Sequence, residues 1–535
     1  MKLRTRLILL LAGPVMYAVS CTNPDAPVMP AAGIVLRIIP AGSGDALAPA
    51  AAAAFDSVAV RVFRGGTPLQ QEAHTGVPVG VDPVEIRVAC VAEAGKRVSV
   101  ELFLNGVMEY AGAAEDVTVK VGAATDVVVD ALPFVVPSLS ATPDVVDDGT
   151  AFSLAWPAAA GAESYVTQAS RTPDFATIEW TQTAADTVAS AQLGPGTHYF
   201  RVAPRTPYAT GTFAGPEFGY VLGGSRQVVV TGFSAAGVIP GETVTVLGEN
   251  LDYPGTQAAV GADELEILSA AWDELVVRVP RGARSGYVSA GSALGVDISD
   301  DPLVVQRIAY VTTGGEFAGS FAGLMGVHGD DVEYSGTAVL LTPQLDTRDM
   351  SVFDVIVIAN DTGTSTSDWG GGIGARVDAV TASGANVLAM GDGGAAFVQL
   401  AASSLAGTTL RVTSQTSCYA SRPSAAVFTT PHAVTGGVLP EWVDVCKNPE
   451  RAVALEINSF AKPTGVSLYA TSAIGNDRWV MADAVFAAGP GTVRYLFWGF
   501  SADPNGFTTD GKDCLANAVT LLYKEHGAVT PAASR

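Results

Sequence analysis

The sequence has few basic residues and only a handful of histidines and cysteines. Lysine and arginine number 30 against 53 aspartates and glutamates, so the formal net charge is −23 at pH 7. The basic residues form no cluster or stripe, and nucleic-acid binding by phosphate neutralisation has no support. With 5 cysteines, 5 histidines and no Cys-x-x-Cys pair, no zinc motif is present. We expect no nucleic-acid partner, no metal site and no cofactor.

Charged residues are also scarce, at 16% of the chain against 48% apolar residues. This balance excludes a largely disordered chain and a coiled coil. A length of 535 residues is too great for one hydrophobic core. The 58 glycines and the many alternating valines and threonines therefore indicate several compact, β-rich domains.

The N-terminal segment has the pattern of an export signal. Three basic residues within the first six positions precede a short apolar run, Leu7 to Ala12, which is too short to span a bilayer comfortably. Cys21 directly follows small residues, and this arrangement resembles the lipobox of bacterial lipoproteins, although Ala18 stands where leucine is most common. An ordinary signal peptide with a chance cysteine is the alternative.

The resemblance implies that Cys21 is lipidated and that residues 1–21 are a signal peptide. Residues 22–32 are rich in proline and are expected to form a tether. Thr22 is not the aspartate that retains lipoproteins in the inner membrane, so the resemblance favours the outer membrane. The expected location is the bacterial envelope, with the membrane contacted through the lipid anchor.

The other four cysteines are interpreted in the light of export, which permits disulfides. Cys418 and Cys446 lie in loop-like contexts of one domain and are the disulfide candidates. Cys90 lies in the strand-like "VEIRVACVA" and is expected to be a small buried hydrophobe.

Residues 33–135 alternate apolar and polar side chains in short runs. "SVAVRVF" places Val58, Val60 and Val62 on one face, and "RVSVELFL" repeats the period. Strands at this spacing predict a small β-sandwich.

Residues 136–225 resemble a fibronectin type III domain. In "LGPGTHYFRV", Leu193, Pro195, Thr197 and Tyr199 fit that family's tyrosine corner. His198, beside the tyrosine, is expected at an exposed strand position. The resemblance implies a spacer or binding module.

Residues 226–305 resemble the IPT/TIG class of immunoglobulin-like domains. The phrase "VTGFSAAGVIPGETVTVLGENL" has the family's glycine at 232, its turn at Pro240-Gly241, and Gly248 followed by Asn250. These residues are expected to set turn geometry and to have no catalytic role.

From residue 306 to 527 the pattern changes to short apolar strands that alternate with helix-length segments, before a tail at 528–535. Such alternation predicts a parallel, doubly wound sheet. The fold class is therefore multidomain: three all-β immunoglobulin-like sandwiches, then an α/β flavodoxin-like doubly wound domain.

Ligands of open α/β sheets bind at the carboxyl ends of the strands, so the residues that follow each strand are the candidate site. The ligand-binding candidates are Thr312, Glu316, Asn360, Asp361, Gly391, Asp392, Gly393 and Asp503. A narrower hypothesis is that the three aspartates converge from three strand ends into one acidic pocket.

This domain resembles the class I glutamine-amidotransferase-like superfamily and, within it, the trehalose-utilisation type. The resemblance rests on "FDVIVIAND", "ASGANVLAMGDGGAAF", "PHAVTGGV" and "GPGTVRYLFWGF". Active members carry a Gly-x-Cys-x-Gly elbow, and aligning "VLAMGDGG" with it puts Gly391 at the cysteine. A shifted register puts Asp392 there instead. Where the trehalose type has Gly-His, this chain has Gly499-Phe500.

The expected nucleophile and base are thus both missing, and His328, His432 and His526 are assigned structural or solvent-exposed roles. No catalytic residue is expected other than the candidate Asp392. The leading hypothesis is a non-catalytic domain that binds a glycan or an envelope protein. The alternatives are a hydrolase or carbohydrate-modifying enzyme that uses Asp392, and a structural or adhesion scaffold.

Overall fold

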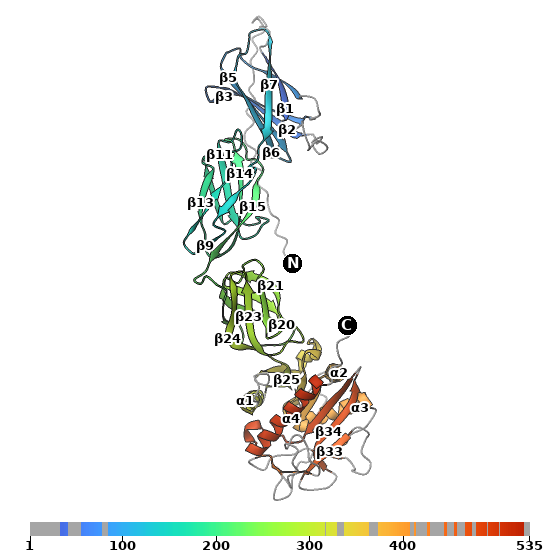
Figure 1. Cartoon of the computed structure of the whole chain (residues 1–535). Helices are drawn as coiled ribbons and strands as arrows, with labels where there is room; N and C mark the ends of the chain where they lie inside the picture. The colour runs from blue at the N-terminus through green and yellow to red at the C-terminus, as the bar shows by residue number, and fades with distance from the viewer. Residues whose placement is uncertain are drawn as a thin grey trace. The chain divides into compact units, whose positions relative to one another are not determined.

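A computed structural model of the chain divides into two compact units, which are considered in turn (Figure 1). It describes residues 33–40, 55–77, 84–315, 317–328, 336–362, 373–406, 411–413, 425–428, 443–446, 454–456, 466–472, 478–488, 491–501 and 503–528. The expected signal peptide, Cys21 and the tether lie outside these residues, as does the tail beyond residue 528.

The first part of unit 1 is a seven-stranded sheet in the order β3-β2-β5-β6-β7-β1-β4. The strands are β1 Gly33–Pro40, β2 Phe55–Arg64, β3 Thr67–Val77, β4 Val84–Ala89, β5 Lys96–Leu104, β6 Val107–Val117 and β7 Ala124–Pro133. Val58, Val60 and Val62 are all buried in its apolar core, as their spacing predicts. The period of two in the sequence therefore identified the inward face.

The next eight strands form a three-stranded sheet, β13-β10-β8, and a five-stranded sheet, β12-β11-β14-β15-β9. Their bounds are β8 Ser140–Thr142, β9 Val145–Asp147, β10 Ala151–Ala155, β11 Ser164–Ser170, β12 Trp180–Ala184, β13 Val188–Gln192, β14 Gly196–Arg205 and β15 Ala214–Leu222. His198 of β14 is fully buried, so the expectation of an exposed position was wrong. Because β14 lies between β11 and β15, most of its residues are covered, and the imidazole Nδ1 pairs with the carboxylate of Glu179.

Unit 2 contains a pair of sheets in the orders β16-β18-β22-β21 and β17-β24-β23-β19-β20. The strands are β16 Val229–Phe233, β17 Gly237–Val238, β18 Thr243–Glu249, β19 Gln257–Val260, β20 Asp263–Glu264, β21 Glu266–Ala271, β22 Glu274–Arg278, β23 Gly286–Ser292 and β24 Gly295–Val305. Gly241 (φ +87°) and Asn250 (φ +58°) adopt the left-handed conformation that tight turns require. The buried Asn250 amide donates to the carbonyls of Ser225 (2.7 Å) and Gln227 (2.9 Å), which fixes this turn.

The C-terminal sheet of unit 2 has the order β26-β25-β27-β28-β35-β34-β33-β30-β31. Its first five strands are parallel: β25 Ile308–Thr312, β26 Thr337–Leu341, β27 Val355–Ile358, β28 Asn386–Met390 and β35 Gly491–Trp498. The remainder is antiparallel: β30 Ala425–Phe428, β31 Val443–Asp444, β33 Val466–Ser472 and β34 Arg478–Ala488, with β29 Arg411–Thr413 paired to β32 Ala454–Glu456. Numbered along the chain, the parallel strands run 2-1-3-4-5.

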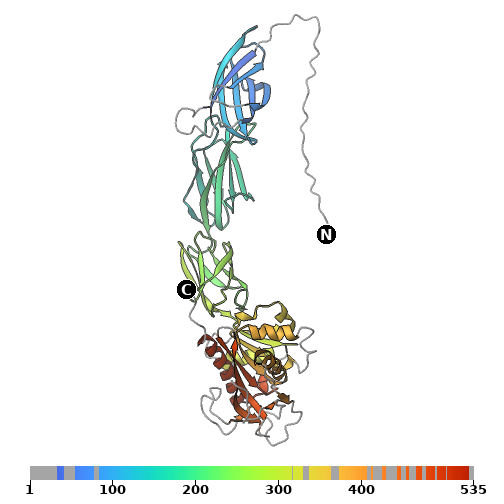
Figure 2. The same cartoon turned by 90° about the vertical axis from the view of Figure 1, so that its right-hand side faces the viewer.

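Helices cover both faces of this parallel sheet (Figure 2). Helices α2 (Ile373–Ala382) and α3 (Gly391–Ala406) contribute to one apolar core, and α1 (Ala318–His328) and α4 (Thr509–Ala528) contribute to the other. Short 3₁₀ turns are η2 Thr342–Asp346, η3 Met350–Val352, η4 Asn360–Thr362 and η6 Pro504–Gly506. The chain is thus mostly β with several sheets, and within the described residues no helix is long and apolar enough to cross a membrane.

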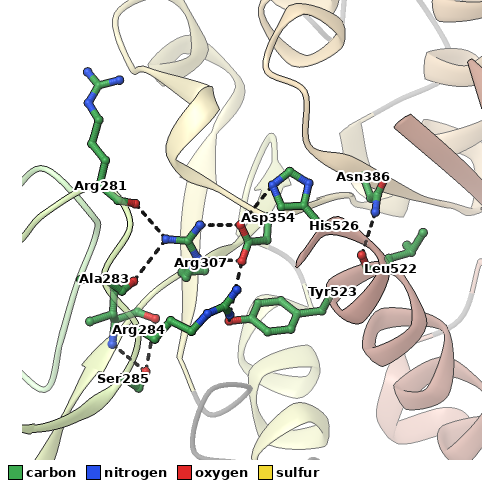
Figure 3. A network of polar contacts seen from close by, with 11 residues as sticks. Arg281, Ala283, Arg284, Ser285, Arg307, Asp354, Asn386, Leu522, Tyr523 and His526 are labelled. Atoms are coloured by element: carbon green, nitrogen blue, oxygen red, sulfur yellow. Dashed lines mark hydrogen bonds and ion pairs between the residues drawn. The ribbon is translucent and has the colours of Figure 1, made fainter. Parts of the chain in front are cut away.

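A buried ion-pair network joins the β24 side of unit 2 to the parallel sheet (Figure 3). Arg307 donates from Nε (2.7 Å) and Nη2 (2.5 Å) to the two oxygens of the fully buried Asp354. Its Nη1 donates to the carbonyl oxygens of Arg281 (2.8 Å) and Ala283 (3.2 Å). His526 Nε2 lies 3.3 Å from Asp354 Oδ1. Arg307 therefore links the loop before β23 to Asp354 at the start of β27, and His526 brings the end of α4 to the same carboxylate.

Candidate functional site

The candidate site lies at the carboxyl ends of the neighbouring strands β25 and β27. From β25 the chain next forms β26 on one side, and from β27 it next forms β28 on the other, so this is where the strand order reverses. In open α/β sheets the crevice outside such a switch point is where ligands bind. Among the strand ends that the sequence predicts as a site, those of β25 and β27 are therefore considered first.

A hydrogen bond between the Thr312 hydroxyl and the Asp361 carboxylate links the ends of β25 and β27 at the switch point. The fully buried Thr312, last residue of β25, donates its hydroxyl to Oδ2 of Asp361 in η4. The same oxygen accepts the N–H of Gly314 at 3.3 Å, and the Thr313 hydroxyl donates to the Asp361 carbonyl. The other oxygen, Oδ1, is buried and accepts no hydrogen bond from the described residues. Asp361 is therefore fixed in orientation and retains acceptor capacity for a ligand hydroxyl.

Asn360 connects the ends of three strands. Its Oδ1 accepts the N–H of Asp392 at 2.9 Å, and its Nδ2 donates to the carbonyl of Ser501 at 3.3 Å. These partners directly follow β28 and β35, so one carboxamide bridges β27, β28 and β35. Ser501 begins one of the strand-end stretches in which the sequence predicts a site, although it is not among the ligand-binding candidates. Its hydroxyl is buried and has no hydrogen-bond partner among the described residues.

Gly391 stands at the turn between β28 and α3, where the resemblance drawn from the sequence would place a cysteine. Its φ is +55°, a left-handed conformation consistent with the strained strand-to-helix elbow that the sequence predicts. A Cβ built on it would lie 2.8 Å from the Asn360 Cγ, closer still to its Oδ1, and 2.9 Å from the Ser501 Oγ. The space that a nucleophilic side chain would need is therefore filled by Asn360 and Ser501.

Gly393 is required for packing. A Cβ there would collide with the Thr362 hydroxyl and the Ala359 carbonyl, and would lie 3.0 Å from the Asn360 carbonyl. Helix α3 can approach η4 this closely only because position 393 has no side chain. The structure thus gives Gly393 a packing role, and its predicted role in ligand binding stays a prediction.

Asp392 lies in the first turn of α3 and is half-buried, with its Oδ1 enclosed by protein. A carboxylate at this end of a helix is stabilised by the helix dipole. The aspartate therefore has a structural use where it stands.

The position of the expected histidine is apolar. Phe500 is only 1% exposed, and its ring centroid lies 5.6 Å from that of the fully buried Trp498 in the core shared with α1 and α4. No imidazole stands at this position to act as a base.

Asp503 is engaged in the η6 turn. Its Oδ1 accepts the N–H of Asn505 at 2.9 Å, and Asn505 in turn donates to the Ser320 hydroxyl of α1 at 2.7 Å. Across the described part of the chain, no three acidic, histidine or cysteine side chains lie close enough together to hold a metal ion.

Hydrogen bonds thus pair Thr312 with Asp361 and Asn360 with Asp392, and the two pairs are joined because residues 360 and 361 are adjacent. Gly391 packs against Asn360. None of these residues is basic, so the cluster has no positive side chain with which to attract an anion. The candidate Glu316 lies outside the described residues, as does Cys418, whose predicted pairing with the buried Cys446 is therefore not described.

No protein-family model matches the chain, and neither does any curated protein. Several solved structures are similar to parts of it. An auxiliary nutrient binding protein from Bacteroides ovatus is 18% identical over 15% of this chain and 21% of its own, with a TM-score of 0.14. The SGBP-B protein of the Bacteroides ovatus mixed-linkage glucan utilisation locus, solved with a heptasaccharide, is 13% identical over 47% of this chain and 60% of its own, with a TM-score of 0.14.

The FN1-FN3 domains of chicken CNTN1 are 10% identical over 47% of this chain and 90% of their own, also with a TM-score of 0.14. This chain covers less than two thirds of both Bacteroides structures. At such TM-scores no common arrangement of the whole chain exists, and the likenesses establish neither a family nor an activity. What the chain is similar to, in parts, is a set of β-rich proteins that includes Bacteroides nutrient- and oligosaccharide-binding proteins.

Proposed function

We propose that this protein is a lipid-anchored envelope protein whose C-terminal amidotransferase-like, flavodoxin-like domain binds a neutral glycan and does not cleave it. The observation that carries the proposal is the position of the Asn360 carboxamide, which fills the nucleophile's space beside the Thr312–Asp361 pair. The strand order 2-1-3-4-5 supports the flavodoxin-like assignment. The export signal, Cys21 and the proline-rich tether support anchoring.

Two features argue that the domain does not use the amidotransferase chemistry. Covalent catalysis needs a nucleophile and a base within hydrogen-bond reach of each other. Position 391 has no side chain and no room for one, and Phe500 belongs to the apolar core. The alternative nucleophile, Asp392, stands in the first turn of α3, where its charge stabilises the helix.

The polar groups at the switch point favour a ligand rich in hydroxyls. The Asp361 Oδ1 is a buried acceptor without a partner among the described residues, and the Ser501 hydroxyl can both donate and accept. Three aspartates and no basic residue stand at positions 312–315, 360–362, 391–393 and 501–503, which disfavours phosphate or carboxylate ligands. A neutral saccharide supplies the hydroxyl donors that these acceptors require.

The β-rich modules are proposed to display this domain. On this proposal residues 33–135 form a sandwich, residues 136–225 a fibronectin type III-like module and residues 226–305 an IPT/TIG-like module, while residues 306–527 bind. The bonds that Arg307 donates to the carbonyl oxygens of Arg281 and Ala283 support a fixed attachment of the last module to the binding domain.

The test is a glycan-array screen of the full chain without its signal peptide, followed by calorimetry on the best oligosaccharide. Asp361→Asn removes the acceptor charge and is expected to weaken binding about tenfold or more. Asp349→Asn, whose carboxylate caps η3, is the control and should bind like the wild type. Mass spectrometry of the oligosaccharide after incubation should show no cleaved product. Cleavage that Asp392→Asn abolishes would instead establish the enzyme alternative.

A further inference from the structure

A cavity of about 250 Å³ lies within unit 1. None of the residues that line it belongs to the α/β domain. Its walls come from β2, β5, β6 and β7 of the first sheet and from the loops around residues 160 and 207. The residues that matter here are Phe63, Arg97, Glu101, Asp130, Glu163 and Tyr208. Pockets for drug-sized ligands measure roughly 300–1,000 Å³, so this cavity suits a single ring.

One wall of the cavity is a buried charged group. Glu101 is only 4% exposed, and its carboxylate pairs with Arg61, which is equally buried. The Thr206 hydroxyl donates to Glu101 Oε1 at 3.2 Å. Arg61 Nε is buried and has no hydrogen-bond partner among the described residues. Burying an ion pair costs several kcal/mol of desolvation per ion, which hydrophobic residues at these positions would avoid. A polar wall here therefore calls for a role other than stability.

An aromatic ring stands beside this wall in a fixed orientation. The Arg61 guanidinium carbon lies 4.0 Å from the Tyr208 ring centroid, and the Tyr208 N–H bonds to the Thr206 hydroxyl at 3.2 Å. The ring centroid of Phe63 lies 6.4 Å from that of Tyr208. With Arg61 stacked against it, Tyr208 is still 44% exposed. The ring is thus held in place before any ligand arrives, which lowers the entropy lost on binding.

The chemistry of the walls selects the ligand. Glu101, Asp130 and Glu163 are hydrogen-bond acceptors, and Arg97 is the charged donor of the lining. The excess of negative charge disfavours an anionic ligand. An exposed aromatic ring offers apolar surface to the C–H face of a sugar, while the carboxylates accept from its hydroxyls.

We propose that this cavity is a second saccharide site, which binds one neutral sugar ring against Tyr208 independently of the strand-end site. The carboxylates of Glu101 and Glu163 accept hydroxyl hydrogen bonds, and Arg97 donates one.

The test is an NMR titration of the full chain with the methyl glycosides of glucose, galactose, mannose, xylose and N-acetylglucosamine. It is made in the Asp361→Asn background, in which the strand-end site is weakened, so that the titration reports the second site. At least one glycoside should saturate the chain, and Tyr208→Ala should weaken that binding about tenfold. Tyr287→Ala is the matched control, because Tyr287 is a 55% exposed tyrosine on β23 in unit 2.

Glu163→Gln provides a second, conservative variant, since Glu163 is exposed and its substitution leaves the buried Arg61–Glu101 pair intact. It should weaken binding severalfold with an unchanged melting temperature. Binding that survives both Tyr208→Ala and Glu163→Gln would overturn the proposal, as would the absence of any saturable glycoside binding in the Asp361→Asn chain. Neither result bears on the strand-end site, which is tested by Asp361→Asn alone.

Discussion

Asn360 fills the space that a side chain on Gly391 would need. The carboxamide reaches across from η4, accepts the N–H of Asp392 and leaves the left-handed glycine no room for a Cβ. The strand-to-helix turn before α3 is thus packed so that position 391 has no room for a nucleophilic side chain. The central claim, a binding site without the nucleophile, depends on this contact.

Gly391→Ala is expected to destabilise the α/β domain by about 1–3 kcal/mol, because the alanine must both adopt a positive φ and displace Asn360. Gly374→Ala is the control. Gly374 lies in α2 with open space around it, so alanine should be neutral or stabilise by at most about 1 kcal/mol. Differential scanning calorimetry measures both. An unchanged melting temperature for Gly391→Ala would contradict the account of the elbow.

Thr312→Val keeps the shape of the side chain and removes the hydroxyl that donates to Asp361. Thr312 is fully buried, so the valine leaves a carboxylate oxygen with one fewer donor, at a cost of about 1.5–3 kcal/mol. Thr243→Val, at an exposed position of β18, should change stability by less than about 0.5 kcal/mol. Equal thermal shifts for the two variants would show that the Thr312 hydrogen bond contributes nothing.

Asp354→Asn should be strongly destabilising. It leaves Arg307 inside the protein without its anion, and breaking a buried pair in this way costs about 3–5 kcal/mol. The matched control is Glu266→Gln, which breaks an exposed pair with Arg278 and should cost about 0–1 kcal/mol. Chemical denaturation followed by tryptophan fluorescence compares them. A loss for Asp354→Asn no larger than that for Glu266→Gln would refute the structural role of the network.

His526 should make stability fall as the pH is lowered. Burial lowers the pKa of this imidazole; Asp354 opposes the shift, while Arg307 and Arg284 add to it. The unfolded chain, with a histidine pKa of about 6.5, therefore binds the proton more readily than the folded chain. Stability is highest above about pH 6.5 and falls as the pH drops from there to the lowered folded pKa, by at most about 1.4 kcal/mol per pH unit.

His526→Gln removes the titrating imidazole and with it this dependence of stability on pH. Melting temperatures of wild type and variant, measured between about pH 5 and pH 7.5, should therefore diverge, with the variant less sensitive to acid. Parallel curves for the two proteins would show that protonation of His526 is not linked to folding.

Local periodicity was sufficient to predict some of these features and not others. The inward faces of β2 and β5 follow from strict alternation, and Val58, Val60 and Val62 are buried as expected. Burial of His198 depends on which strands lie on either side of β14 and on a partner, Glu179, 19 residues away. Such pairing is a property of sheet order, which a single sequence does not encode locally.

The site shows the same division. A glycine turn between a strand and a helix at Gly391 follows from reading a short motif. That Asn360 fills the empty space follows only from the close approach of β27, β28 and β35, because its partners Asp392 and Ser501 are 32 and 141 residues away in the sequence. The contacts of the buried Glu101 could not be predicted from the sequence either, because strand alternation alone does not bring Arg61, Glu101 and Thr206 together.

The most direct test of the proposed function is the binding isotherm of the preferred oligosaccharide with the wild-type chain and with Asp361→Asn, measured by calorimetry. The account predicts saturable binding by the wild type, a loss of about tenfold or more in Asp361→Asn, and an oligosaccharide recovered intact. Binding that is equally tight in both proteins, or a hydrolysed oligosaccharide, would contradict it.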